Sequence, residues 1–255
     1  MEVKNVIVGV IFVVVLYVVY IYAFKNKHNS LIKTQKVDSS IKVDVSGNSS
    51  SNAYSMWLFI SEWNNTENYK HVMSRESKNK NDDKLYSPTV YLDKTTNMLT
   101  ISYQLDVDDD KKPNLDKITI SDFPIQSWTN LIISTNTTTV DIYINGKLIR
   151  SHGLSQPLNN PRGKLYLGRL NNVDTINYPM HKDDDDETAK SGVLNSYNGY
   201  ISTATYFDEP ITPGEAWKIY TNGYDGAGLD PNVLGKYKIK MTILDNNKEM
   251  QSVEI

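Results

Sequence analysis

The side chains best placed to do chemistry in this sequence belong to two acidic runs, at residues 106–110 and 183–187. Ca²⁺ prefers several carboxylate and carbonyl oxygens as ligands, so the second run could hold a calcium ion. Its candidate ligands are Asp183, Asp184, Asp185 and Asp186. The first run lacks the glycine and the glutamate that an EF-hand loop requires. A solvated loop of like charges is the favoured interpretation of both runs, and we expect no required cofactor.

Histidine and cysteine provide few further candidates for catalysis or metal binding. The chain has no cysteine, which excludes disulfides, thiol nucleophiles and cysteine-bound metals. Its four histidines are widely separated: His28, His71, His152 and His181. A histidine that acts as a general base needs a nucleophile and an orienting group beside it. No nucleophile motif accompanies any of the four, so we expect them at surface or packing positions.

The charge balance limits the partners. The 226 residues after residue 29 carry 24 basic and 29 acidic side chains. Nucleic-acid binding needs a concentrated basic face, so we expect no nucleic-acid partner. The length of 255 residues allows one large domain or two small ones.

Residues 1–24 are predicted to anchor the chain in a lipid bilayer. Val6 to Phe24 is a run of 19 residues without a charge. A helix of that length is ~28 Å long, close to the ~30 Å hydrocarbon core of a membrane. A cleaved signal peptide is the alternative, but its apolar region is shorter, about 7–15 residues, and ends at small residues. We therefore predict an uncleaved signal-anchor with one transmembrane helix over 6–24.

The flanking charges predict on which side of the membrane the domain lies. Lys4 alone precedes the apolar run, and four lysines follow it: Lys25, Lys27, Lys33 and Lys36. By the positive-inside rule, the C-terminal part lies on the cytosolic side of a single-pass protein. Three glycosylation sequons favour the opposite, lumenal orientation. Their acceptors are Asn48, Asn64 and Asn136.

Beyond a polar linker over 25–40, the pattern is that of an all-β domain. Apolar residues alternate in short segments such as 41–45 and 117–120, bounded by Asn, Asp, Gly and Pro. Such spacing is typical of an antiparallel sandwich. Period-two patterning at 237–243 predicts at least one added strand in a C-terminal extension, 223–255.

Two local signals are specific. Segments 128–133 and 140–144 read as paired strands, and Asn145-Gly146 after the second predicts a type I′ turn into a third strand. Thr212 and Pro213, with Glu215 as the third residue after the cap, predict a helix that ends by Asn222.

These segments occur in an order that resembles a known family. The hairpin is followed by strands at 163–168 and 199–207 and by the turn and helix at 211–220, while 54–60 resembles an opening strand. Together they resemble the laminin-G-like, concanavalin A-like lectin/glucanase superfamily over about 41–222. The resemblance implies a jelly roll of two antiparallel sheets, and it does not specify a function.

The family includes retaining glucanases, which carry a Glu-x-Asp-x-x-Glu motif on one strand. No pair of glutamates in this chain has that spacing with an aspartate between them. We therefore predict that the protein is not an enzyme, with a glycoside hydrolase or lyase as the less favoured alternative. Trp63, in a polar context, is the candidate for a ligand-binding rim, whereas Trp57 and Trp128 are expected in the core.

The leading hypothesis is a non-catalytic, membrane-anchored binding or scaffolding protein. A short anchor followed by a cysteine-free laminin-G-like domain resembles membrane-associated structural proteins of large DNA viruses. This resemblance implies a minor capsid protein that links the internal membrane of a virion to other capsid proteins. The alternative is a carbohydrate-binding, lectin-like domain displayed on a cell or particle surface.

Overall fold

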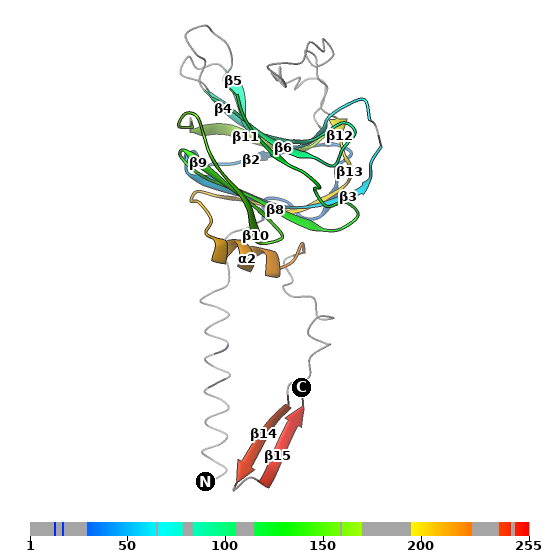
Figure 1. Ribbon diagram of the computed structural model, residues 1–255, viewed down its shortest axis with the longest axis vertical. Coiled ribbons are helices and arrows are strands. Elements are labelled where there is room, and N and C mark those ends of the chain that lie inside the picture. The colour runs from blue at the N-terminus through cyan, green and yellow to red at the C-terminus, as the bar shows by residue number, and fades with distance from the viewer. Residues whose placement is uncertain are drawn as a thin grey trace.

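The computed structural model describes residues 13, 17, 30–64, 66–78, 84–105, 115–158, 160–169, 195–225, 240–245 and 248–254. Two sheets packed face to face make up the main body, with one short helix below them (Figure 1). Among the described residues, the strand pairs are antiparallel except for one short parallel pair between β12 and β4. This arrangement confirms the predicted all-β sandwich.

Sheet A is the lower sheet in Figure 1 and has the strand order β1-β13-β3-β8-β9-β10. Its strands are β1 (Gln35–Lys36), β13 (Asn198–Phe207), β3 (Asn52–Glu62), β8 (Thr129–Asn136), β9 (Thr139–Ile144) and β10 (Lys147–Gly153). Sheet B has the order β2-β11-β4-β5-β6-β7. Its strands are β2 (Ser40–Asp44), β11 (Pro161–Gly168), β4 (Lys70–Lys78), β5 (Lys84–Leu92), β6 (Leu99–Gln104), β7 (Leu115–Ile120) and β12 (Asn195–Ser196) beside β4.

The core lies between the two sheets and follows from the period of two along each strand. Met56 and Leu58 of β3 face Val90 and Leu92 of β5 and Ile101 of β6 within one buried cluster. A fully buried side chain of this size contributes roughly 1.5–3 kcal/mol to stability. The alternating segments of the sequence therefore provide the apolar surface that joins the sheets.

The predicted hairpin and helix are both present. Asn145 and Gly146 have φ angles of 51° and 73°, as a type I′ turn requires, and they join β9 to β10. Helix α2 (Pro213–Thr221) starts at the N-cap Thr212 with a complete capping box and ends at the C-cap Asn222.

The sandwich includes residues that the sequence places in the linker. β1 pairs with β13, and Ile32 and Val37 are buried in the core, 8% and 0% exposed. These apolar side chains are isolated in a polar segment, so no alternation marks them as part of a sheet.

The predicted transmembrane segment lies outside the described residues, apart from Val13 and Tyr17. Within the described part of the chain, no helix has both the length and the apolar character needed to cross a membrane. At the other end of the chain, β14 (Lys240–Asp245) and β15 (Lys248–Glu254) pair with each other as a separate two-stranded sheet.

The β9–β10 turn supports α2 directly, which makes Gly146 a critical residue. A Cβ atom added to Gly146 would lie 2.9 Å from the Tyr220 Cβ and 3.1 Å from the Trp217 Cα. The residue also has a left-handed φ of +73°. Both the close approach and the backbone conformation therefore require glycine.

We expect Gly146→Ala to lower the free energy of unfolding by about 1–3 kcal/mol, because alanine strains the turn and displaces α2. Urea denaturation followed by tryptophan fluorescence measures the change. Gly214→Ala is the matched control, since a Cβ at Gly214 meets no atom within 4 Å. In a helix, this control should be neutral or stabilising by up to about 1 kcal/mol. Equal effects of the two changes would contradict the role of Gly146.

Candidate functional site

Sheet A carries large apolar side chains on both faces, and the candidate site lies on its outer face. Along β3, Met56 and Leu58 belong to the core, so Trp57 and Phe59 point outward. Phe59 pairs in register with Tyr200 of β13. An apolar outer face of this kind is stable in water only when other groups cover it.

Helix α2 covers one part of this outer face. Ala216 is fully buried and packs in a cluster with Ile132 and Tyr143 of the sheet. The Ser134 hydroxyl accepts a hydrogen bond from the backbone N–H of Ile211 at 2.7 Å. The Tyr143 hydroxyl donates to the Ile211 carbonyl at 3.4 Å. These bonds fix the residue just before the N-cap, and they hold the start of α2 on the sheet.

A pocket of about 400 Å³ lies where β13 ends, along one side of α2. We name it the α2 pocket. Its lining combines polar and apolar side chains: Asp208, Glu209, Glu215, Lys218, Phe207 and Ile219. A cavity with an apolar wall and a few convergent polar groups is the usual form of a small-molecule site.

The carboxylates of the α2 pocket differ in their hydrogen-bond partners. Glu215 accepts hydrogen bonds from the backbone N–H and the hydroxyl of Thr212, at 2.9 and 2.7 Å, within the capping box. Asp208 and Glu209 take no part in that cap. Burial, with a smaller contribution from the Asp208 charge, raises the pKa of Tyr206 to about 12. The Tyr206 hydroxyl, which is buried and whose ring packs against the core between the sheets, therefore stays neutral at physiological pH.

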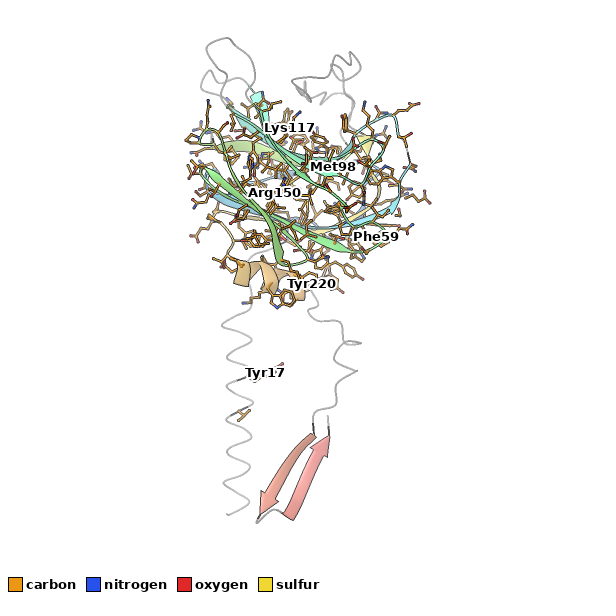
Figure 2. All side chains as sticks on the ribbon, viewed as in Figure 1. Tyr17, Phe59, Met98, Lys117, Arg150 and Tyr220 are labelled. Carbon is orange, nitrogen blue, oxygen red and sulfur yellow. The ribbon has the colours of Figure 1, made fainter. Side chains whose placement is uncertain are left out.

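Seven aromatic rings form a continuous series over the rest of the outer face. Consecutive ring centres lie 4.5 to 6.4 Å apart, in the order Tyr200, Phe59, Trp128, Tyr224, Trp57, Tyr220 and Trp217. We name this set the aromatic face. Phe59 lies in the lower part of the sandwich and Tyr220 lies on helix α2 below it, whereas Lys117 lies in the upper sheet (Figure 2). Stacked and edge-on pairs at these distances add to the stability gained by burial.

Three members of the aromatic face are open to solvent. Tyr200, Trp217 and Tyr224 are 42%, 50% and 38% exposed, and Leu148 on the neighbouring β10 is 47% exposed. Leu148 pairs with Tyr143, whose side chain packs under α2, so Leu148 also lies on the outer side. The aromatic face thus presents a large apolar surface to its surroundings.

Trp57 is buried, as expected, whereas Trp128 is only partly buried. Trp57 is 6% exposed, but it lies on the outer side of sheet A, where it contacts Tyr220 and Tyr224. Trp128 stacks on Tyr224 with ring centres 4.5 Å apart. Their burial comes from residues more than 90 positions later in the chain, which strand periodicity cannot reveal.

Trp63, the predicted rim residue, follows β3 at the edge of the sandwich. It is partly buried against the core, and its indole N–H donates to the Lys94 carbonyl at 3.2 Å. The Lys70 ammonium lies 4.5 Å from its ring centre, and the same ammonium donates to the Lys94 carbonyl at 2.9 Å. The structure does not bring Trp63 together with the α2 pocket.

The predicted calcium ligands Asp183, Asp184, Asp185 and Asp186 lie outside the described residues. Among the residues that the structure does describe, no group of three or more metal-ligating side chains could hold a metal ion.

The three sequon acceptors are all exposed: Asn48, Asn64 and Asn136. Their exposure makes them accessible to a glycosyltransferase but does not say on which side of a membrane they lie.

A serine and a histidine meet inside sheet B, which the sequence did not reveal. His71 Nε2 and Ser74 Oγ are 2.6 Å apart, and His71 Nδ1 lies 2.6 Å from the Gly168 carbonyl. A carbonyl can only accept, so Nδ1 carries the proton and Ser74 donates to Nε2. His71 and Ser74 are both fully buried, and the orienting group is a carbonyl rather than a carboxylate. This pair therefore serves packing in the described structure rather than nucleophilic attack.

Comparison with known proteins agrees with this architecture. The family profile described as the concanavalin A-like lectin/glucanases superfamily, of laminin G type, matches residues 34–179. No curated protein sequence matches the chain. The matched segment starts within the predicted linker, one residue before β1.

Solved structures share the fold at low sequence identity. The botulinum neurotoxin serotype D binding domain has a TM-score of 0.50 at 15% identity, over 76% of this chain and 44% of that chain. The serotype D ligand binding domain in complex with N-acetylneuraminic acid has a TM-score of 0.51 at 15% identity, over 79% and 46%. This chain therefore spans less than half the length of these solved structures, and the likeness concerns the fold alone. The matches carry no information on a virion, so that setting stays a prediction.

The buried His71 predicts a specific dependence of stability on pH. Burial lowers the pKa of His71 to about 4, below the ordinary 6.5. The unfolded chain therefore binds this proton more readily, and the free energy of unfolding falls as the pH drops from 6.5 towards 4. The slope is about 1.4 kcal/mol per pH unit, or roughly 2 kcal/mol between pH 6.5 and 5.

We expect His71→Gln to remove this part of the pH dependence in urea denaturation. His152→Gln is the matched control, because it leaves His71 in place and should keep the dependence. An NMR titration of the wild-type chain tests the same point without a substitution. A His71 imidazole that titrates near 6.5 in the folded chain would contradict the burial argument.

Proposed function

Because the chain belongs to the concanavalin A-like lectin/glucanases superfamily, we propose that it is a non-catalytic module that binds carbohydrate in the α2 pocket. The observation that carries the proposal is the lining of this pocket, where Asp208 and Glu209 stand beside the apolar Phe207 and Ile219. A volume of about 400 Å³ is sufficient for one or two sugar rings. Proteins with this fold have many different functions, so the function is inferred from the residues of the pocket rather than from the fold.

The chemistry of a sugar fits both parts of this lining. Ring hydroxyls donate hydrogen bonds to carboxylates, and hydrogen bonds to charged acceptors are stronger than those between neutral groups. The C–H face of a sugar ring packs on apolar side chains such as Phe207 and Ile219. Lys218 adds a donor for a hydroxyl or carbonyl oxygen of the ligand.

The charge of the pocket selects among sugars. Asp208, Glu209 and Glu215 contribute three carboxylates to the lining, against the single ammonium of Lys218. An acidic sugar would place its carboxylate among like charges, which disfavours its ionised form in the pocket. We therefore propose neutral glycans as the ligand class, in contrast to the N-acetylneuraminic acid bound by the similar toxin domain.

Two observations support the absence of catalysis. Glu215 is held in the capping box, and this leaves Asp208, which also interacts with Tyr206, and Glu209 as the remaining carboxylates of the pocket. These two are adjacent in the sequence, whereas a glycosidase uses two carboxyl groups that flank the scissile bond from opposite sides. The structures with this fold described above are named as binding domains.

A glycan array probed with the full chain tests the proposed function. We expect binding to neutral glycans and weaker or no binding to their sialylated counterparts. Asp208→Asn and Glu209→Gln should each weaken the affinity at least about tenfold, because each removes a charged hydrogen-bond acceptor. Asp44→Asn is the matched control, since Asp44 is an exposed aspartate on β2 of sheet B and is not among the residues that line the α2 pocket.

Three results would overturn the proposal. The first is an array without any bound glycan, and the second is binding that survives both pocket substitutions unchanged. The third is glycan cleavage that is lost on substitution of Asp208 or Glu209, which would contradict the non-catalytic role and favour a hydrolase or lyase.

A further inference from the structure

The aromatic face is an apolar surface that remains partly exposed to solvent in the described structure. Tyr200, Trp217, Tyr224 and Leu148 are all more than a third exposed, and they lie on β13, on and just after α2, and on β10. Trp and Tyr combine an apolar ring with a polar N–H or O–H group. This composition differs from that of an ordinary core fragment, and it is enriched where proteins meet the interface of a lipid bilayer.

The N-terminal segment joins the sandwich directly beside this face. The Leu31 backbone N–H donates to the Ala204 carbonyl at 2.7 Å, and β1 continues along the edge of β13. The Ser202 hydroxyl connects the two regions, because it lies 2.6 Å from the Thr34 hydroxyl and donates to the Tyr224 carbonyl at 2.6 Å. The start of the domain thus lies close to the backbone of Tyr224, whose ring belongs to the aromatic face.

The length of the tether limits how far the domain can be from a membrane. The sequence predicts a transmembrane segment that ends at Phe24, and only five residues separate Phe24 from Ser30. Six Cα-to-Cα steps of at most about 3.6 Å reach about 22 Å. If residues 6–24 span a bilayer, the edge of sheet A must lie within that distance of its surface.

From this juxtaposition we propose that the aromatic face rests on the lipid interface, with Tyr200, Trp217, Tyr224 and Leu148 among the headgroups. The proposal rests on the predicted transmembrane segment and is independent of carbohydrate binding. Lys147, which precedes Leu148 in β10, and Lys33 in the N-terminal segment are both exposed. Their charges favour a leaflet that contains anionic lipid.

The absence of cysteine makes the test direct, because single cysteines can be introduced and spin-labelled in the full chain. The variants are Leu148→Cys and Tyr200→Cys, with Arg162→Cys as the control on the exposed side of β11 in sheet B. Each is reconstituted into vesicles of phosphatidylcholine, with and without phosphatidylserine. The readout is the ratio of collision rates of the label with oxygen, which enters lipid, and with a water-soluble nickel complex.

We expect a severalfold higher ratio for the labels at 148 and 200 than for the label at 162. Vesicles with phosphatidylserine should give the larger difference. Equal ratios at all three positions would overturn the proposal, as would a chain that alkaline carbonate extracts from the vesicles. Labels at 148 and 200 that are equally shielded in detergent micelles, together with cross-linked dimers, would assign the aromatic face to a second copy of the chain instead.

Failure here is distinguishable from failure of the proposed function. The glycan array reports on Asp208 and Glu209 in the α2 pocket, whereas the spin labels report on Leu148 and Tyr200. Unchanged glycan binding by Leu148→Cys and Tyr200→Cys would show that the pocket remains folded in the labelled chains.

Discussion

The apolar outer face of sheet A is the constraint on which the rest of the architecture depends. A sheet in a sandwich needs one apolar face, but β3 presents Leu58 to the core and Trp57 and Phe59 to the outside. Leaving such rings in water is unfavourable, so the chain returns after β13 and places α2 and Tyr224 against them. The helix is therefore a structural requirement of this sheet, and both candidate surfaces follow from its position.

Helix α2 forms these two surfaces because its sides have different neighbours. Ala216 is the buried contact with the sheet, and it allows close approach because its side chain is small. Glu215 and Ile219 lie towards the end of β13, where the α2 pocket forms. Trp217 and Tyr220 lie over the Gly146 turn and join the aromatic face. A rotation of the helix would disrupt both surfaces, which explains why the N-cap is held by several hydrogen bonds.

The sequence predicts the features whose signals are local. The Asn145-Gly146 turn and the Thr212 capping box depend on a few adjacent residues, and both are present as predicted. The aromatic face depends on contacts between residues far apart in the sequence, which local patterns do not reveal. The only local indication is that consecutive residues of β3 are apolar, which is typical of a strand covered on both faces. The His71–Ser74 pair was missed for a different reason. A register shift between His71 and Met73 breaks the alternation that would otherwise place residues three apart on opposite faces.

The two proposed interactions share one helix, and this has a thermodynamic consequence. A glycan in the α2 pocket would contact the side of α2 that carries Lys218, and lipid would contact the side that carries Trp217. Each ligand would restrict the same short helix, which is held on the sheet by contacts that include Ala216 and the Ile211 hydrogen bonds. Ordering by one ligand reduces the entropy that the second must lose. Binding at the pocket and at the membrane should then strengthen each other equally, because coupling between two sites is reciprocal.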